Sequence, residues 1–324
     1  VYNLTIPNIK NLLKKLDHDF DWYFGESNVV KETDLVVSKA IEDNKVKKDS
    51  GALISTEDVD PPILITKSDG SYLYLTTDLG TVYFRENKDN FDKYIYIVDA
   101  RQKNHFEQLF KTVKHFELSE SDFYHVGFGT INGSDNKPFR TRDGGVYKLN
   151  LLFEDVKSKL TKYNSDDNVL NSLTNTVLTY SDLLPNRNQN YIFDVDKFTD
   201  INGKTGIYIQ YAQVRAKKLL ENSDIAGSFD NNLEMSDEER NLLFQITMFD
   251  NFFDLSLSNM EPHHLAEYLY SLSQSFNSFY SNIKIFKDDL SLDIQKNRIK
   301  MVEEFYNTAK IVFECLGIRP VDSM

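Results

Sequence analysis

The sequence predicts two parts, an α/β part with a parallel sheet and, after it, an all-α helical bundle. Two patterns predict this arrangement. Up to residue 129, short apolar runs alternate with helical segments of about a dozen residues, which is typical of parallel strands joined by crossover helices. After Gly145, long stretches of helical periodicity replace the alternation. A chain of 324 residues, 40% of them hydrophobic, can bury a core in each part.

The α/β part is predicted from a regular order of elements. A helical pattern at residues 35–41 comes first, followed by strand-like runs at 51–55 and 63–66. From Tyr72 onward the pattern predicts a strand at 72–75, a helix at 77–87, a strand at 94–98, a helix at 105–116 and a strand at 123–129. This order is typical of half of a Rossmann-like, doubly wound sheet.

The bundle is predicted from helical patterns whose ends carry capping signals. Ser236 ahead of Glu239 fits a capping box, Pro262 fits a first turn, and Gly317 fits a stop. The predicted helices span residues 149–160, 168–184, 205–220, 237–253, 262–285 and 292–316. No flexible linker separates the parts, and we place the domain boundary between residues 1–204 and 205–324.

The charge restricts the classes of partner. The net charge is −13, and residues 205–324 alone hold 11 Lys and Arg against 18 Asp and Glu. This excludes a protein that grips nucleic acid only by neutralising phosphates, so any such contact must use local patches and shape. No apolar run is long enough for a membrane span, and no signal peptide is evident, so we expect a cytoplasmic protein. We expect the single cysteine, Cys315, to be a buried apolar side chain.

Asp78 is the first candidate site residue, because ligands of open α/β sheets bind where the parallel strands end. A carboxylate there could hold a guanidinium through two hydrogen bonds. The alternative is a helix start at which Thr76 or Thr77 caps and Asp78 only favours the positive end.

Two further loops carry polar groups toward the same edge. Arg101, Gln102 and His105 follow the strand at 94–98; Gln102 could orient a planar polar ligand, or it could be a solvated loop amide, and His105 could be structural. A glycine-rich segment then carries clustered cations that suit phosphoryl or nucleotidyl transfer, although an exposed basic hairpin explains them equally well. These cations are Lys137, Arg140 and Arg142.

One predicted helix combines aromatic and basic side chains. Tyr208, Tyr211 and Arg215 follow one another at helical spacing, with Lys217 and Lys218 beside them. Such a face can stack on unpaired bases and hold a phosphate backbone. The alternative is that the tyrosines belong to the core.

Taken in order, these segments resemble arginyl-tRNA synthetase, a class I enzyme, from about Phe20 to the last residue. The resemblance rests on FGES, SGAL, KSDGSYLYLTTDLG, YIVDARQKNHFEQLF, HVGFG, KPFRTRDGG, YIFDVDKF, TGIYIQYAQVR and the closing LGIRPVDSM. It implies the second half of the catalytic domain and an anticodon-binding bundle. It also implies arginine, ATP with Mg²⁺, and tRNA(Arg) as partners of a monomeric parent enzyme, without a tightly bound cofactor.

The resemblance also implies roles for single residues. Tyr74, Asp78 and Gln102 match the arginine-binding positions, and Val126, Gly127 and Phe128 match the strand end against which adenine lies. Lys137, Arg140 and Thr141 match the mobile phosphate loop. The positions that match tRNA contacts are Tyr208, Gln210, Tyr211, Arg215 and Met324.

The other half of the class I signature, a pair of histidines around a small residue and a glycine, has no match in this sequence. His263 and His264 are adjacent and cannot replace it. We therefore expect a fragment of a longer enzyme that is inactive alone. The alternative is a noncatalytic synthetase-like module that binds tRNA or protein, and an unrelated nucleotide-binding protein is a third reading.

Overall fold

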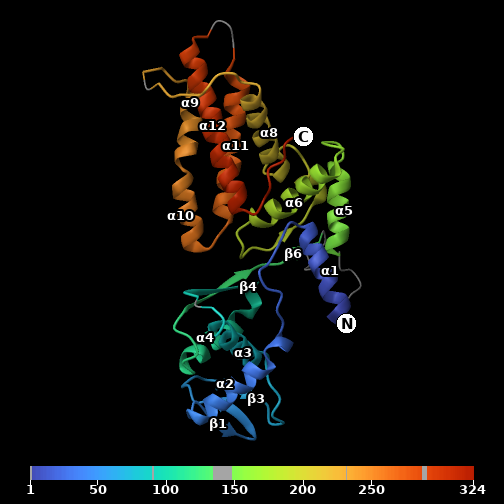
Figure 1. Ribbon diagram of the computed structural model, residues 1–324, viewed down its shortest axis with the longest axis vertical. Helices are drawn as coiled ribbons and strands as arrows, with labels where there is room; N and C mark the ends of the chain where they lie inside the picture. Colours follow the sequence, from blue (N-terminus) through green and yellow to red (C-terminus); the bar gives the residue numbers. More distant parts are fainter. Residues whose placement is uncertain (1, 90, 134–147, 231, 287–289) are drawn as a thin grey trace. The chain divides into compact units, whose positions relative to one another are not determined.

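The structure is a computed structural model that describes residues 2–89, 91–133, 148–230, 232–286 and 290–324 (Figure 1). Internal contacts divide the chain into two compact units. Phe20–Gly129 form one, which we call the α/β unit, and Val1–Asp19 with Thr130–Met324 form the other, which we call the helical unit. Parallel strands in the first and a helical bundle in the second confirm the predicted fold class.

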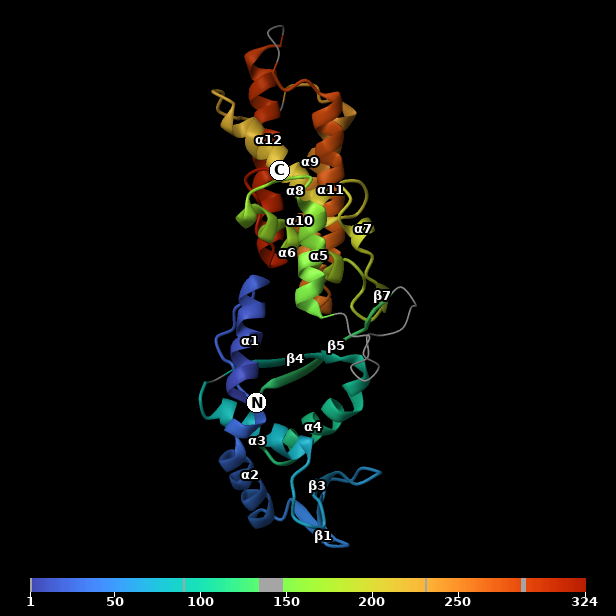
Figure 2. The same ribbon diagram turned by 90° about the vertical axis from the view of Figure 1, so that its right-hand side faces the viewer.

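The α/β unit contains two small sheets. Strands β1, β2 and β3 are antiparallel, whereas β4 and β5 are parallel and in register from Lys93 opposite Asp122 to Asp99 opposite Phe128. Helices α3 and α4 lie on one side of β4 and β5 (Figure 2). In chain order the elements are η1 (Glu26–Asn28), α2 (Val30–Glu42), β1 (Val46–Asp49), β2 (Ala52–Ser55), β3 (Leu64–Thr66), α3 (Tyr74–Glu86), β4 (Lys93–Asp99), η2 (Ala100–Gln102), α4 (Lys103–His115) and β5 (Asp122–Phe128).

The core of the α/β unit joins α2, α3 and α4 to the inner face of the parallel strands. Leu79, Val82 and Leu109 are fully buried in it. Helices α2 and α3 cross closely at Gly80, where a Cβ atom would lie 2.2 Å from Thr33 Oγ1. A glycine is therefore needed inside this helix, despite its cost to helix stability.

The predicted strand at residues 72–75 is wrong. Only Tyr72 forms an isolated bridge, to Thr66, and α3 already begins at Tyr74. The chain turns at Gly70, which has a φ of +80°, and α3 begins only four residues later. The alternating apolar residues that suggest a strand also supply Leu75 at helical spacing from Leu79, and burial of that helix face decides the outcome.

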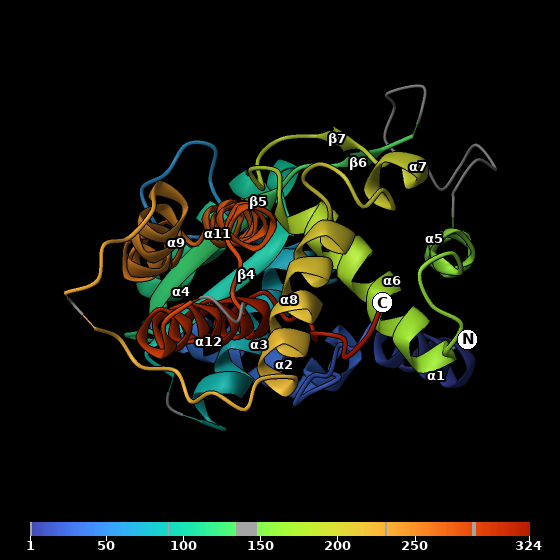
Figure 3. The ribbon, with the colours of Figure 1, turned by 90° about the horizontal axis from the view of Figure 1, so that it is seen from above.

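The helical unit consists of α1 and most of the chain after residue 130. Helix α11 is seen nearly along its axis in Figure 3, and the short strands β6 and β7 pair in parallel. The elements are α1 (Tyr2–Lys15), β6 (Ile131–Asn132), α5 (Leu149–Leu160), α6 (Asp167–Leu183), β7 (Tyr191–Ile192), α7 (Val195–Phe198), α8 (Gly206–Glu221), α9 (Asp237–Thr247), α10 (Phe249–Asn259), α11 (His263–Asn282) and α12 (Leu292–Cys315).

Aromatic side chains fill the core of the bundle. Phe276 of α11 and Phe305 of α12 stack with ring centroids 4.0 Å apart and planes 7° apart. The hydroxyl of buried Tyr180 donates to the carbonyl of Ala266 at 2.9 Å, which satisfies its polar end. The capping box of Ser236 and Glu239 is confirmed at the start of α9.

Two predictions for the helical unit are wrong. The predicted helix at 237–253 is two helices, α9 and α10, separated at Met248, whose amide donates to Gln245 three residues back. The apolar pattern continues on both sides of this turn and does not reveal it. Cys315 is exposed, because the buried face of α12 runs through Val312, Phe313 and the following Leu316.

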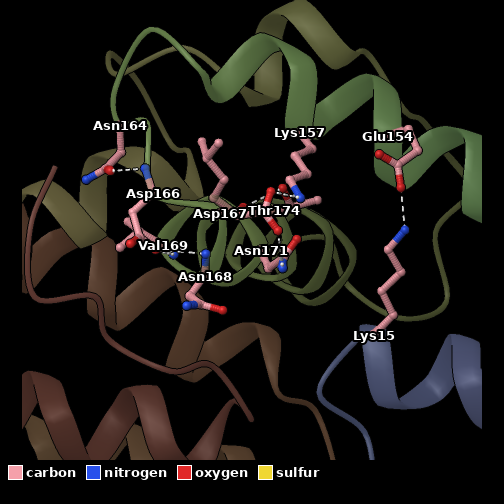
Figure 4. A network of polar contacts seen from close by, with 11 residues as sticks. Lys15, Glu154, Lys157, Asn164, Asp166, Asp167, Asn168, Val169, Asn171 and Thr174 are labelled. Atoms are coloured by element: carbon pink, nitrogen blue, oxygen red, sulfur yellow. Dashed lines mark hydrogen bonds and ion pairs between the residues drawn. The ribbon is translucent and has the colours of Figure 1, made fainter.

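A network of polar side chains joins α1, α5 and α6 (Figure 4). Lys15 at the end of α1 forms an ion pair with Glu154 of α5 and lies 4.4 Å from the ring centroid of Phe153. Lys157 pairs with Asp167 of α6 at 2.6 Å. The start of the chain is thus attached to the helical unit. Among the described residues, no helix combines the length and apolar character needed to cross a membrane.

Candidate functional site

The first candidate site lies at the start of α3. Tyr74 is the first residue of the helix and is 75% exposed, and Asp78 follows one turn later. Asp78 Oδ2 lies 2.7 Å from Nε2 of His105 on α4, and both side chains are about 30% exposed. The structure therefore brings Asp78 and His105 together, from two helices, as a half-exposed carboxylate–imidazole pair.

The alternative explanation of Asp78 as part of a capped helix start does not hold. The residue before α3 is Leu73, which makes no side-chain cap. Thr76 Oγ1 donates to the carbonyl of Ile65 at 2.5 Å, and Thr77 Oγ1 donates to the carbonyl of Tyr74 at 2.9 Å. Neither threonine accepts from a free amide of the first turn, and Asp78 lies beyond that turn.

A cavity of about 740 Å³ lies beside this pair, within the α/β unit. Tyr74, Thr77 and His105 line it, together with Lys67 and the apolar residues around Ile63. Its size is in the range of small-molecule sites, and it combines apolar walls with a few polar groups.

In the loop after β4, Gln102 is exposed, whereas the guanidinium of Arg101 is paired with Asp99. Gln102 is exposed and precedes α4, so that it lies one helical turn before His105. Arg101 is held by Asp99, at 2.6 Å between Nη2 and Oδ2, and its amide donates to the same carboxylate at 2.8 Å. These hydrogen bonds lower the pKa of Asp99 to about 2. Gln102 is therefore the free polar side chain of this pair, and Arg101 shapes the turn.

The end of β5 lies beside this loop. Val126 is buried, Phe128 is 43% exposed, and Phe128 is opposite Asp99 in the parallel register. A Cβ atom at Gly127 would lie 3.0 Å from the Cα atom of Ala100, so the turn after β4 packs closely on β5 at this glycine. The residues predicted for adenine and for the arginine side chain thus meet at one edge of one unit. Lys137, Arg140 and Thr141 lie outside the described residues.

A second candidate site runs along α8 and α11 of the helical unit. The guanidinium of Arg215 donates to Tyr211 at 2.9 Å and to Asn277 at 3.0 Å, and it lies 4.0 Å from the ring centroid of Tyr211 and 4.8 Å from that of Tyr280. All four side chains are partly or fully accessible to solvent.

Tyr208 extends this surface along α8. Its ring centroid is 5.3 Å from that of Tyr270, and Nζ of Lys204 lies 5.6 Å from the Tyr270 ring. We use the name α8–α11 surface for the side chains of Tyr208, Tyr211 and Arg215 on α8 together with those of Tyr270, Asn277 and Tyr280 on α11. Sequence reasoning missed its α11 members, although their spacing of seven and ten residues gives a helix face; they are Tyr270, Asn277 and Tyr280.

Gln210 and Met324 take different positions from the tyrosines. Gln210 is fully buried; its amide nitrogen donates to Thr176 Oγ1 and to the Arg319 carbonyl, both at 2.8 Å, and its oxygen accepts from the Val321 amide at 3.0 Å. Met324 packs against an apolar cluster of the helical unit. Gln210 therefore holds the tail of the chain rather than facing solvent.

Comparisons with known proteins match both parts of the chain. The family described as tRNA synthetases class I (R), catalytic domain, matches residues 3–195, and the DALR anticodon binding domain matches residues 209–324. The arginine–tRNA ligase of Alkaliphilus oremlandii is 33% identical over the whole chain, which spans 58% of that relative. That of Francisella tularensis is 35% identical over 97% of the chain, which spans 57% of it.

Solved structures agree with these sequence matches. Arginyl-tRNA synthetase from Plasmodium falciparum superposes with a TM-score of 0.82 at 27% identity, over 99% of this chain and 57% of that one. The Thermus thermophilus enzyme gives the same TM-score at 18% identity, over 97% of this chain and 62% of that one, which shows the shared fold. With its catalytic-domain segment followed by a DALR domain, the chain belongs to the class I arginyl-tRNA synthetase family.

Proposed function

We propose that this chain is the C-terminal portion of an arginine–tRNA ligase, which activates arginine with ATP and Mg²⁺ and transfers it to tRNA(Arg). The observation that carries the proposal is the Asp78–His105 pair beside the cavity that Tyr74 lines. The family membership and the share of its relatives that the chain spans, 57–58%, support it as well.

The Asp78 carboxylate supplies the charge that an arginine side chain requires. A guanidinium offers parallel N–H groups that match both oxygens of a carboxylate, whereas the ammonium of lysine offers a point charge. Oδ2 of Asp78 lies 2.7 Å from Nε2 of His105, which would orient the carboxylate. Each carboxylate oxygen has a further acceptor site, so both can still accept from a guanidinium. In this proposal Tyr74 covers the side chain and Gln102 orients the polar end of the amino acid.

ATP would lie along the end of β5. The backbone of Val126 to Phe128 runs at the edge of the sheet beside the Gln102 loop, and the exposed ring of Phe128 offers a flat apolar face for adenine. Lys137, Arg140 and Thr141 would stabilise the charge that develops on the phosphates, with Mg²⁺ as counterion. We expect residues 1–324 alone to bind these ligands without completing adenylate formation.

The α8–α11 surface would contact the anticodon arm. Its rings can stack on unpaired bases, which contributes about 1–3 kcal/mol for each base, and Arg215 can pair with phosphate or stack in turn. Gln210 would act by holding the tail that carries Met324. The proposed domain boundary at 204/205 would assign these residues to one tRNA-binding part.

The arginine site is tested by titrating the chain with L-arginine, L-lysine and L-citrulline. We expect arginine to bind, and Asp78→Asn to weaken it about 10- to 150-fold, because a charged hydrogen bond contributes about 1.5–3 kcal/mol. The matched control is Asp122→Asn, at the opposite end of β5. Equal affinity for arginine and citrulline, or equal loss in both variants, would contradict the assignment.

The tRNA site is tested separately with tRNA(Arg) and a lysine tRNA over a salt series. Tyr211→Ala should weaken binding about 5- to 150-fold through lost stacking, whereas Tyr211→Phe keeps the ring and should lose much less. The control is Phe244→Ala, which removes a ring that is 57% exposed on α9. Selective tRNA binding without any arginine binding would favour the noncatalytic module instead.

A further inference from the structure

Two histidines and a glutamate gather at the turn between α10 and α11. Glu261 Oε2 lies 3.2 Å from Nε2 of His264 and 4.0 Å from Nδ1 of His263. The three ligand atoms are all within 4.8 Å of one another, and this is the one such group of three among the described residues. The turn lies where α10 meets α11 in Figure 1, in the helical unit.

His263 adds an unsatisfied ring nitrogen to this group. Its Nδ1 is buried and has no hydrogen-bond partner, which is unusual for a buried polar atom. The imidazole rings of His263 and His264 are 4.0 Å apart between centroids. A buried ring nitrogen without a partner, beside a second imidazole and a carboxylate, is suited to bind a cation.

The backbone of the turn is fixed before any ligand binds. Met260 is left-handed, with φ of 54°. The amide of Glu261 donates to the Ser256 carbonyl at 2.9 Å, and Ser256 Oγ donates back to the Glu261 carbonyl at 2.9 Å. Asn186 Nδ2 donates to Glu261 Oε1 at 3.3 Å, which leaves Oε2 directed at the histidines. Such outer contacts orient metal ligands in known sites.

We propose that Glu261, His263 and His264 form a binding site for a divalent transition metal ion, with Zn²⁺ as the ion that the ligand set fits best. Imidazole and carboxylate ligands suit zinc, at bond lengths of about 2.0–2.2 Å. Tetrahedral geometry with such bonds separates ligand atoms by roughly 3.3 Å. The Glu261–His264 pair, at 3.2 Å, already has this separation, and Nδ1 of His263, at 4.0 Å from Glu261 Oε2, would have to move closer.

The site would leave a fourth position for water, since three protein ligands with one open position are a common zinc arrangement. All three ligands come from four consecutive residues, so the ion would stiffen the α10–α11 turn. Neither the arginine pocket nor the α8–α11 surface includes these residues, and the site is independent of the proposed ligase function.

The test uses the full chain without a histidine tag, stripped with a chelator and dialysed against Zn²⁺ alone. We expect about one zinc ion per chain and a higher melting temperature with zinc, because an ion that binds the native state stabilises it. His264→Ala should lose both effects. Glu261→Gln keeps the Oε1 acceptor for Asn186 and should lose most of the affinity. The matched control, His18→Ala, removes an exposed histidine and should retain both effects.

Two results would overturn the proposal. One is zinc uptake by His264→Ala and Glu261→Gln equal to that of the unmodified chain. The other is absence of uptake by the unmodified chain at zinc concentrations that saturate an ordinary two-histidine, one-carboxylate site. Circular dichroism of each variant without zinc identifies a variant that has not folded, and the remaining variant then decides.

Discussion

Replacing Gln210 by alanine tests how the end of the chain is held. The side chain makes three hydrogen bonds of 2.8–3.0 Å, and two of them go to the backbone of Arg319 and Val321. Thr176 Oγ1 keeps its bond to the Ser172 carbonyl in the variant, so two backbone groups lose their partners. An unsatisfied buried group costs about 1–3 kcal/mol, and water entering the space recovers part of this cost. We expect a loss of about 2–4 kcal/mol in the free energy of unfolding of the helical unit.

Gln213→Ala is the matched control, because Gln213 lies on the same helix and is equally buried. Its amide nitrogen makes one bond of 3.3 Å, to the Tyr306 carbonyl, and its oxygen has no partner. We expect it to cost at most about 1 kcal/mol in polar contacts. Urea unfolding gives the free energies, and hydrogen exchange of the Val321 amide reports release of the tail. Equal losses in the two variants, with the Val321 amide still protected in Gln210→Ala, would refute the reasoning.

The remaining predictions concern the α/β unit. Gly80→Ala should destabilise this unit by about 1–3 kcal/mol, because the new Cβ would lie 2.2 Å from Thr33 Oγ1. The control is Gly25→Ala, since the atom nearest to its new Cβ would be 3.9 Å away. Equal melting temperatures of the two variants would contradict the close crossing of α2 and α3. Burial, and after it the hydrogen bond to Asp34, raises the pKa of Tyr72 to about 12 from 10.0. The contribution of the neutral Tyr72 hydroxyl to the free energy of unfolding is complete below pH 10 and is lost between pH 10 and 12. Tyr72→Phe should therefore reduce the fall in the free energy of unfolding over this pH range, measured by urea unfolding. An unchanged pH dependence in the variant would contradict this role of Tyr72.

The sequence predicts those elements whose periodicity has a single structural explanation. The parallel strands β4 and β5 and the helices α5, α6, α8, α11 and α12 follow from such patterns. The start of α3 does not, because its apolar residues satisfy both a strand and a helix pattern, and contact with α2 at Gly80 selects the helix. The break at Met248 likewise leaves no trace in hydropathy, since both helices present apolar residues to α11.

The sequence predicts those side-chain contacts of the candidate sites that form between neighbours on one helix, and it does not predict contacts between residues that are distant in the sequence. The helical spacing of Tyr211 and Arg215 correctly predicts that the two side chains meet. The pairing of Asp78 with His105, 27 residues away, requires the packing of α3 on α4, which periodicity does not specify. Gln210 looks equivalent to its tyrosine neighbours in the sequence, and only the position of the tail reveals that it is buried.

The acidic charge of the chain restricts how the proposed contact with tRNA can form. With a net charge of −13, long-range attraction to phosphate is weak, and the described cations of the α8–α11 surface and its edge are Arg215 and Lys204. Two cations on a single strand give a salt slope of only about −1.4, so affinity must come mainly from the rings. Stacking is accessible only where bases are unpaired, as in a loop. In the proposed role, an acidic chain with an aromatic surface would repel duplex RNA and would hold a loop by stacking, which is a physical basis for selecting an anticodon arm among other nucleic acids.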